Sequence, residues 1–142
     1  MLRNLVINPG STSTKIALFD GNKIVFVKTI IHDFSKNDLK GPIWNQLPMR
    51  KHVILETLKE NNIDINSIDA ITGRGGIIKP VKAGTYIVNK EIINDSKNSE
   101  VNHASNLGSG LVYEIAAINN VLAYISDPVC VDEMTPIAKI SV

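Results

Sequence analysis

The segment with the most chemical content is the octet NPGSTSTK at residues 8–15. Pro9-Gly10 is a turn dipeptide, and glycine lets the backbone approach a ligand closely. Four hydroxyl residues and Lys15 follow; hydroxyls and exposed backbone N–H groups donate to phosphate oxygens, and the ammonium adds a point charge. The octet is not a Walker-type P-loop, which needs G-x-x-x-x-G-K-[ST] between a strand and a helix. It indicates a phosphate-binding turn, the alternative being a polar hairpin turn with a solvated lysine.

Three further residues could act on the same anion. Arg74 lies between glycines at 73–76, which leave its guanidinium room to bind an anion as a fork; the alternative is an arginine in a flexible loop. His103 precedes an expected helix, whose positive end favours a neutral, hydrogen-bond-donating imidazole, unless it only caps the helix. Asp127 follows an expected strand and either faces a cation or starts a turn.

The octet needs two strands to hold it, and the flanking sequence supplies them. Apolar segments with strand character occur at 2–7, 14–19 and 23–31, and Asp20-Gly21-Asn22 is a strong turn signal between the second and third. Tight connections between three successive strands predict an antiparallel meander. The octet is then the turn of its first hairpin.

Two helices are indicated by apolar residues at helical spacing. The first begins near Pro48, which suits a first helical turn, and runs to about residue 60. Its expected core face comprises Ile54, Leu55 and Leu58, and its expected solvated face comprises Arg50, Lys51, Glu56 and Lys59. The second helix covers 105–119 with Ser105 as its cap, and its expected core face comprises Leu107, Leu111, Val112, Ile115 and Ile118.

Shorter strands are expected at 68–72, 85–88 and 121–126, with one or two helical turns at 90–97. The main elements follow the order β-β-β-α-β-α-β, which predicts an α/β fold. Open α/β sheets bind ligands at the carboxyl ends of their strands, where the octet, the glycine-flanked arginine and the aspartate all fall. Phosphoryl transfer needs these parts: cationic and hydrogen-bond-donating groups for the phosphoryl oxygens and a carboxylate toward Mg²⁺.

The bulk composition excludes several classes of protein. A chain of 142 residues with 44% hydrophobic residues and a net charge of +1 is an ordinary globular domain, with no charge excess for nucleic acid or membrane surfaces. Cys130 has no disulfide partner in the chain, and no signal-peptide layout precedes the octet, so we expect a cytoplasmic protein. His32 and His52 have no partner pattern and are expected to be structural or superficial.

Four segments span nearly the whole chain: NPGSTSTK at 8–15, TGRGG with IKPVKAGTY at 72–86, NHASNLG at 102–108 and DPVCVDEMTPIAKIS at 127–141. In these segments and their order the chain resembles the acetate and butyrate kinase family, and its butyrate kinases most closely. The resemblance implies a ribonuclease-H-like domain of the actin-like ATPase superfamily, with a mixed sheet and flanking helices. It also implies transfer of phosphoryl from ATP to butyrate or a related short-chain carboxylate, giving an acyl phosphate.

The resemblance also implies roles for single residues. The positions that match the family's phosphate-contacting hairpin are Asn8, Ser11, Ser13 and Lys15. Arg74 matches the arginine that holds the carboxylate and the transferring phosphoryl group. His103 matches the histidine that donates to the phosphoryl group, and Asp127 matches the acid associated with Mg²⁺.

Residues 1–142 correspond in this family to a single N-terminal domain, and we expect the second, adenosine-binding domain to be absent. We therefore expect the chain to be inactive alone, and to form a homo-oligomer or associate with a complementary domain. An alternative is a non-catalytic or degenerate half-domain that binds a partner chain. A sugar or glycerol kinase of the same superfamily is a further alternative, against which the RGG and HASN segments argue.

Overall fold

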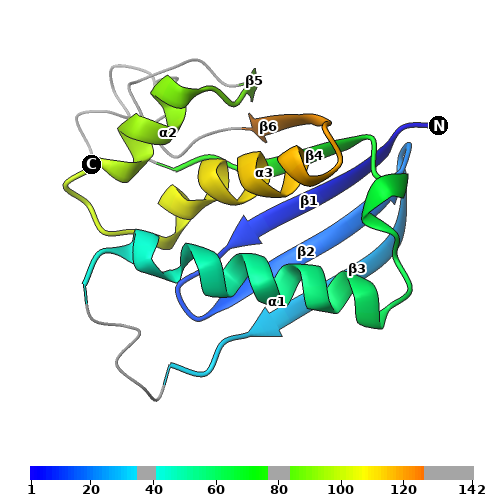
Figure 1. Ribbon diagram of the computed structural model, residues 1–142, viewed down its shortest axis with the longest axis horizontal. Helices are drawn as coiled ribbons and strands as arrows, with labels where there is room; N and C mark the ends of the chain where they lie inside the picture. Colours follow the sequence, from blue (N-terminus) through cyan, green and yellow to red (C-terminus); the bar gives the residue numbers. More distant parts are fainter. Residues whose placement is uncertain (35–40, 77–83, 127–142) are drawn as a thin grey trace, which may run out of the picture.

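The computed structural model describes residues 1–34, 41–76 and 84–126 (Figure 1). This part of the chain is built on a six-stranded mixed sheet with the strand order β3-β2-β1-β4-β6-β5. The strands are β1 (Arg3–Pro9), β2 (Ser13–Asp20), β3 (Lys23–Ile31), β4 (Ala70–Arg74), β5 (Thr85–Ile87) and β6 (Leu122–Ser126). The helices are α1 (Leu47–Glu60), α2 (Lys90–Lys97) and α3 (Leu107–Ile118), with 3₁₀ turns η2 (Ile43–Gln46), η3 (Ile65–Ser67) and η4 (Ala104–Asn106).

The first three strands form the antiparallel meander that the sequence predicts. Alternate residues of β1 and β2, including Leu5, Ile7 and Ile16, are completely buried because successive side chains of a strand point to opposite faces. Gly21 takes a φ of +58° in the turn before β3, a conformation that costs glycine no Cβ clash. The octet forms the tip of this hairpin, as expected, but only its residues 10–12 are the turn; the others belong to the ends of β1 and β2.

The centre of the sheet is parallel. β4 pairs with β1 on one side and with β6 on the other, both in parallel, while β5 pairs antiparallel with β6. The expected strand at 68–72 is displaced: β4 covers Ala70–Arg74, because its pairing with β6 continues to Arg74↔Ser126. The glycine segment expected to break this strand therefore contributes its first two residues to it.

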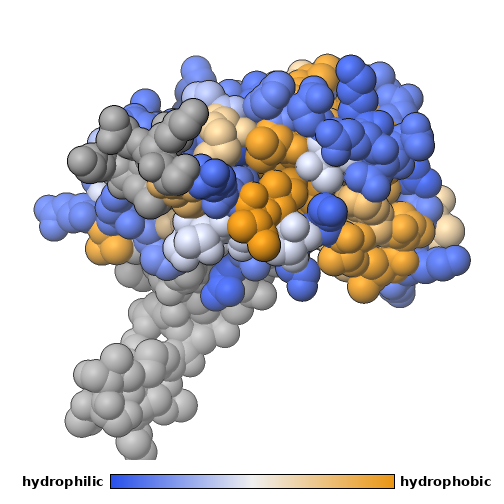
Figure 2. Space-filling model, turned by 90° about the horizontal axis from the view of Figure 1, so that it is seen from below, coloured by the Kyte–Doolittle hydropathy of each residue, from blue (hydrophilic) through white to orange (hydrophobic). Residues whose placement is uncertain are grey.

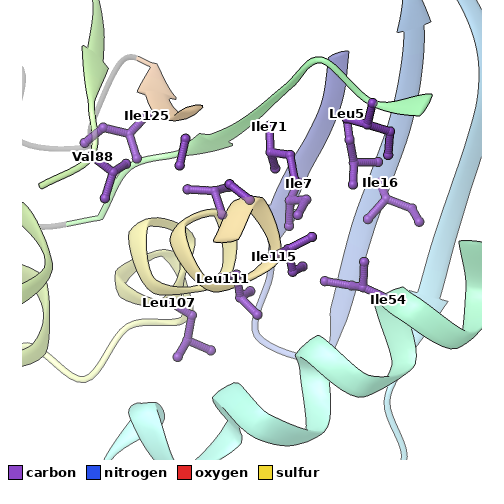
Figure 3. Packing of buried hydrophobic residues seen from close by; sticks show 14 of the residues in the cluster. Leu5, Ile7, Ile16, Ile54, Ile71, Val88, Leu107, Leu111, Ile115 and Ile125 are labelled. Atoms are coloured by element: carbon purple, nitrogen blue, oxygen red, sulfur yellow. The ribbon is translucent and has the colours of Figure 1, made fainter. Parts of the chain in front are cut away.

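The helices α1 and α3 lie against one face of this sheet and supply its core (Figure 1). In Figure 3, Ile54 of α1 points toward Ile16 of β2, and Ile115 of α3 lies beside Ile7 of β1. All four side chains are fully buried, which confirms the expected core positions among them. Among the described helices, none is long and apolar enough to cross a membrane.

Three expectations about the helices are wrong. Arg50 is not solvated but 0% exposed, and Ile118, at the last position of α3, is not in the core but 47% exposed. Ser105 does not cap the long helix: it belongs to the 3₁₀ turn η4, which His103 caps through its side chain. The preceding histidine is thus the residue that fixes the start of this helical segment.

Candidate functional site

A row of side chains crosses the sheet where β1 and β4 end. Asn8 and Lys15 are direct partners in the β1–β2 ladder, and the parallel pair Ile7↔Gly73 places Asn8 level with Arg74. Their chain neighbours Ile7 and Gly73 face the core, so alternation directs Asn8, Lys15 and Arg74 to the opposite face, where all three are exposed. With strands about 4.8 Å apart, the row from Lys15 to Arg74 spans about 10 Å. The structure brings these three predicted site residues together.

The hairpin loop beside this row keeps its carbonyl groups on the inside. Gly10 N donates to Ser13 O at 2.7 Å, which closes the turn. The carbonyls of Gly10, Ser11 and Ser13 also accept bonds from Arg50, at 2.7, 3.3 and 3.1 Å, and Thr12 O accepts from the His32 backbone N–H at 3.0 Å. Within the described residues, the N–H groups of Ser11 and Thr12 donate to no protein acceptor. Outward amides and exposed hydroxyls are the donor set that an anion requires.

Thr14 differs from the other hydroxyl residues of the octet. Its side chain is completely buried, and its Oγ1 lies 3.1 Å from Arg50 Nη1 and 2.8 Å from His32 Nε2. The expected series of four ligand-facing hydroxyls is therefore reduced to Ser11, Thr12 and Ser13.

Arg50 and His32 form the buried support of the loop. Arg50 was expected to be solvated, whereas His32 was expected to be structural or superficial and is structural. Burial lowers the pKa of Arg50 to about 10, so it stays charged at neutral pH. Burial, and then the charge of Arg50, lower the pKa of His32 to about 4, which makes this imidazole neutral. The neutral imidazole shares a hydrogen bond with the Thr14 hydroxyl through Nε2, and Thr14 Oγ1 also accepts from Arg50 Nη1. One feature of the sequence indicated that Arg50 is buried. It lies four residues before the core residue Ile54, so the two side chains share one face of the helix.

The glycines around Arg74 serve helix packing. A Cβ at Gly73 would lie 2.7 Å from Val112 Cγ1, and one at Gly76 would lie 2.4 Å from the Cα of Asn106. Gly108, at the start of α3, is equally constrained, because its Cβ would meet the Arg74 carbonyl oxygen at 2.0 Å. The segment therefore brings α3 onto the end of β4, while the Arg74 side chain stays exposed on the other face.

His103 lies in the turn that packs beside this glycine segment. Its Nδ1 accepts from the Ser105 backbone N–H at 3.1 Å and lies 2.6 Å from Ser105 Oγ. With Nδ1 as an acceptor, the nitrogen left to donate is Nε2, and the side chain is exposed. The structure thus shows the capping role that the sequence left as the alternative, and donation from Nε2 to a phosphoryl group stays a prediction.

Asp127, expected to associate with Mg²⁺, lies outside the described residues, as do Cys130 and the whole 127–141 segment. It directly follows Ser126, the partner of Arg74 in the sheet. Residues 1–34, 41–76 and 84–126 contain no group of three or more His, Cys, Asp or Glu side chains that could hold a metal ion. His52 is exposed on α1, as expected of a superficial histidine.

Comparison with known proteins agrees with the resemblance found in the sequence motifs. No protein-family model matches the chain. Over 142 residues it is 48% identical to butyrate kinase 1 of Clostridium acetobutylicum, which covers 99% of the chain. The chain spans 40% of the length of that relative.

Solved structures with the same fold include an acetate kinase from Porphyromonas gingivalis, with a TM-score of 0.59 and 14% identity over 89% of this chain and 37% of that one. A propionate kinase from Francisella tularensis subsp. tularensis gives 0.57, with 14% identity and the same coverage. RuvC from T. thermophilus in complex with a Holliday junction gives 0.52, with 12% identity over 89% of this chain and 65% of that one. At these identities the solved structures establish the fold alone. Together with the butyrate kinase match, they confirm that this chain has the ribonuclease-H-like fold and resembles the acetate and butyrate kinase family.

Proposed function

We propose that this chain carries the phosphate- and carboxylate-binding part of a cytoplasmic kinase that transfers phosphoryl from ATP to butyrate or a related short-chain carboxylate. The observation that carries the proposal is the row of Lys15, Asn8 and Arg74 beside a loop in which the Ser11 and Thr12 amides donate to no acceptor among the described residues. Two cations about 10 Å apart, on strands β2 and β4 with β1 between them, suit a reaction that has an anion at each end of a phosphoryl transfer. The 48% identity to a butyrate kinase supports the choice of acceptor.

In the proposed reaction a carboxylate oxygen attacks the γ-phosphorus of ATP, the bond from this phosphorus to the β,γ-bridging oxygen breaks, and ADP leaves with that electron pair. Asn8, Lys15 and the loop residues Ser11 and Ser13 hold the phosphates. Arg74 orients the carboxylate as a fork, so that the nucleophile is aligned before the reaction. His103 donates its Nε2–H to an oxygen of the transferring phosphoryl group.

Magnesium would enter as the MgATP substrate and would offset phosphate charge. Asp127 is the residue proposed to face it, and it follows the β6 position paired with Arg74. We further propose that 1–142 acts as one domain, and that turnover needs a complementary adenosine-binding domain, from a second copy or a partner.

Titration of the purified chain with MgATP tests the phosphate site. Lys15→Ala should weaken binding at least tenfold, because it removes the point charge beside the loop. Lys28→Ala is the matched control: this lysine of β3 is also exposed, but its ladder partner is the core residue Ile16. Equal affinities of the two variants would contradict the assignment of Lys15.

The alternative is a non-catalytic half-domain that associates with a partner chain. The edge strand β3 supports it, because Ile24, Val25, Val27 and Ile31 are all exposed there. The view from below in Figure 2 shows hydrophobic surface among hydrophilic surface on this side of the molecule. This alternative predicts that the chain binds MgATP only when the partner is present, so the same titration distinguishes the two functions.

A further inference from the structure

Arg50 is a buried cation whose partners are mostly backbone carbonyls. Its side chain is 0% exposed, and within the described residues no carboxylate forms an ion pair with it. Gln46 Oε1 accepts from Nε at 3.1 Å and from Nη2 at 2.9 Å, and the Phe34 ring centroid lies 5.8 Å from Cζ. Removing a charge from water without a counter-ion costs free energy. If Arg50 only held the fold together, a neutral side chain would do so at a lower cost.

The remaining donors of Arg50 all reach the hairpin. Nη1 contacts Gly10 O, Ser13 O and Thr14 Oγ1, and Nη2 contacts Ser11 O. A peptide group whose carbonyl points inward has its neighbouring amide available on the outside. The guanidinium thus sets which way the loop's peptide groups face, and it leaves a positive charge directly beneath them.

We propose that Arg50 is a positioning residue for phosphate binding: it holds the hairpin carbonyls inward so that the Ser11 and Thr12 amides face the phosphates. The proposal rests on the proposed function, because the anion concerned is the phosphate of that site. Gln46 supports Arg50 in turn: its Oε1 accepts from Nε and Nη2 and so holds the guanidinium in its plane, while the other donors contact the hairpin. His32 and Thr14 complete the support without adding charge, because the imidazole is neutral.

The test is MgATP and inorganic phosphate titration of the full 142-residue chain, with amide chemical shifts of the loop recorded by NMR. Arg50→Lys keeps the charge but loses the fork, and Arg50→Met loses both. Affinity should fall at least tenfold in Arg50→Lys and further in Arg50→Met, with the Gly10 to Ser13 amide signals shifted. Lys51→Met, the neighbouring cation paired with Glu114 on the α1 surface, should bind like the original chain.

Thermal unfolding separates positioning from general destabilisation. A structural role alone would lower the melting temperature and leave the affinity of the folded protein unchanged, and that outcome in Arg50→Lys would overturn the proposal. If the Arg50 variants do not fold, Gln46→Ala keeps the arginine but frees its guanidinium, and we expect about threefold weaker phosphate binding; unchanged binding would again overturn the proposal. If the original chain binds neither ligand, the proposed function itself fails, and the role of Arg50 in it fails for that separate reason.

Discussion

At the scale of single residues, neighbours in the octet have opposite roles. Thr14 is buried against Arg50 and His32, while Lys15 is exposed beside Asn8. The sequence identified the segment because its residue types suit an anion, but composition cannot assign each hydroxyl to a face. That assignment follows from the strand register, which places Thr14 opposite Pro9 and Lys15 opposite Asn8.

Arg74 is expected to matter for ligands and little for stability. Its side chain is exposed, and within the described residues no hydrogen bond or ion pair holds it. Arg74→Ala should change the free energy of unfolding by less than about 0.5 kcal/mol, yet weaken binding of butyryl phosphate at least tenfold and lower any turnover by orders of magnitude. Denaturant unfolding and calorimetric titration measure the two effects. Normal affinity of the variant for butyryl phosphate would contradict the assignment of Arg74 to the site.

His32 should make stability depend on pH. Its pKa is about 4 in the folded chain and 6.5 in the unfolded chain, so below pH 6.5 the unfolded state binds the extra proton. The contribution is fully present above pH 6.5 and is lost as the pH falls toward 4. Between pH 7.5 and pH 5 this lowers the free energy of unfolding by about 2 kcal/mol.

Urea unfolding at the two pH values measures this effect, and His32→Gln removes the titrating group. The difference in stability between pH 7.5 and pH 5 should be about 2 kcal/mol smaller in the variant. An unchanged difference would show that His32 is not buried as a neutral imidazole.

At the scale of elements, helical and strand periodicity predicted most of the fold. The strand 23–31 agrees with β3, and 90–97 agrees with α2. The boundary of β4 was misplaced because glycines usually interrupt strands, whereas here they permit the close approach of α3. Arg50 was misassigned because a buried arginine is rare and its partners in the hairpin, three carbonyls and the Thr14 hydroxyl, are 36–40 residues away in the chain.

The contact between α3 and β4 can be tested directly. In Gly108→Ala the new Cβ would lie 2.0 Å from the Arg74 carbonyl oxygen, so backbone must move, and we expect a loss of about 2–4 kcal/mol in the free energy of unfolding. Ser109→Ala is the control on the same helix: the buried Ser109 Oγ has no hydrogen-bond partner in the described part of the chain, so its removal should cost almost nothing. Equal stabilities of the two variants would contradict the tight packing at the end of β4.

At the scale of the whole molecule, the fold and the joint placement of three candidate site residues were predictable for different reasons. Four motifs in order indicated the family, and the sheet topology then placed Asn8, Lys15 and Arg74 in one row. Asp127 and its expected cation remain a prediction, because that residue lies outside the described part. The chain spans 40% of the butyrate kinase it matches, so the catalytic assembly is a question about the complete molecule.

The most direct test is acyl-phosphate formation by the purified chain, of confirmed intact mass, with MgATP and butyrate. We expect the chain to bind MgATP, with a contribution from Lys15, and acyl phosphate to form only when a complementary adenosine-binding domain is added. If the folded chain fails to bind MgATP and yields no acyl phosphate even with that domain present, the row of Lys15, Asn8 and Arg74 is not a phosphoryl-transfer site.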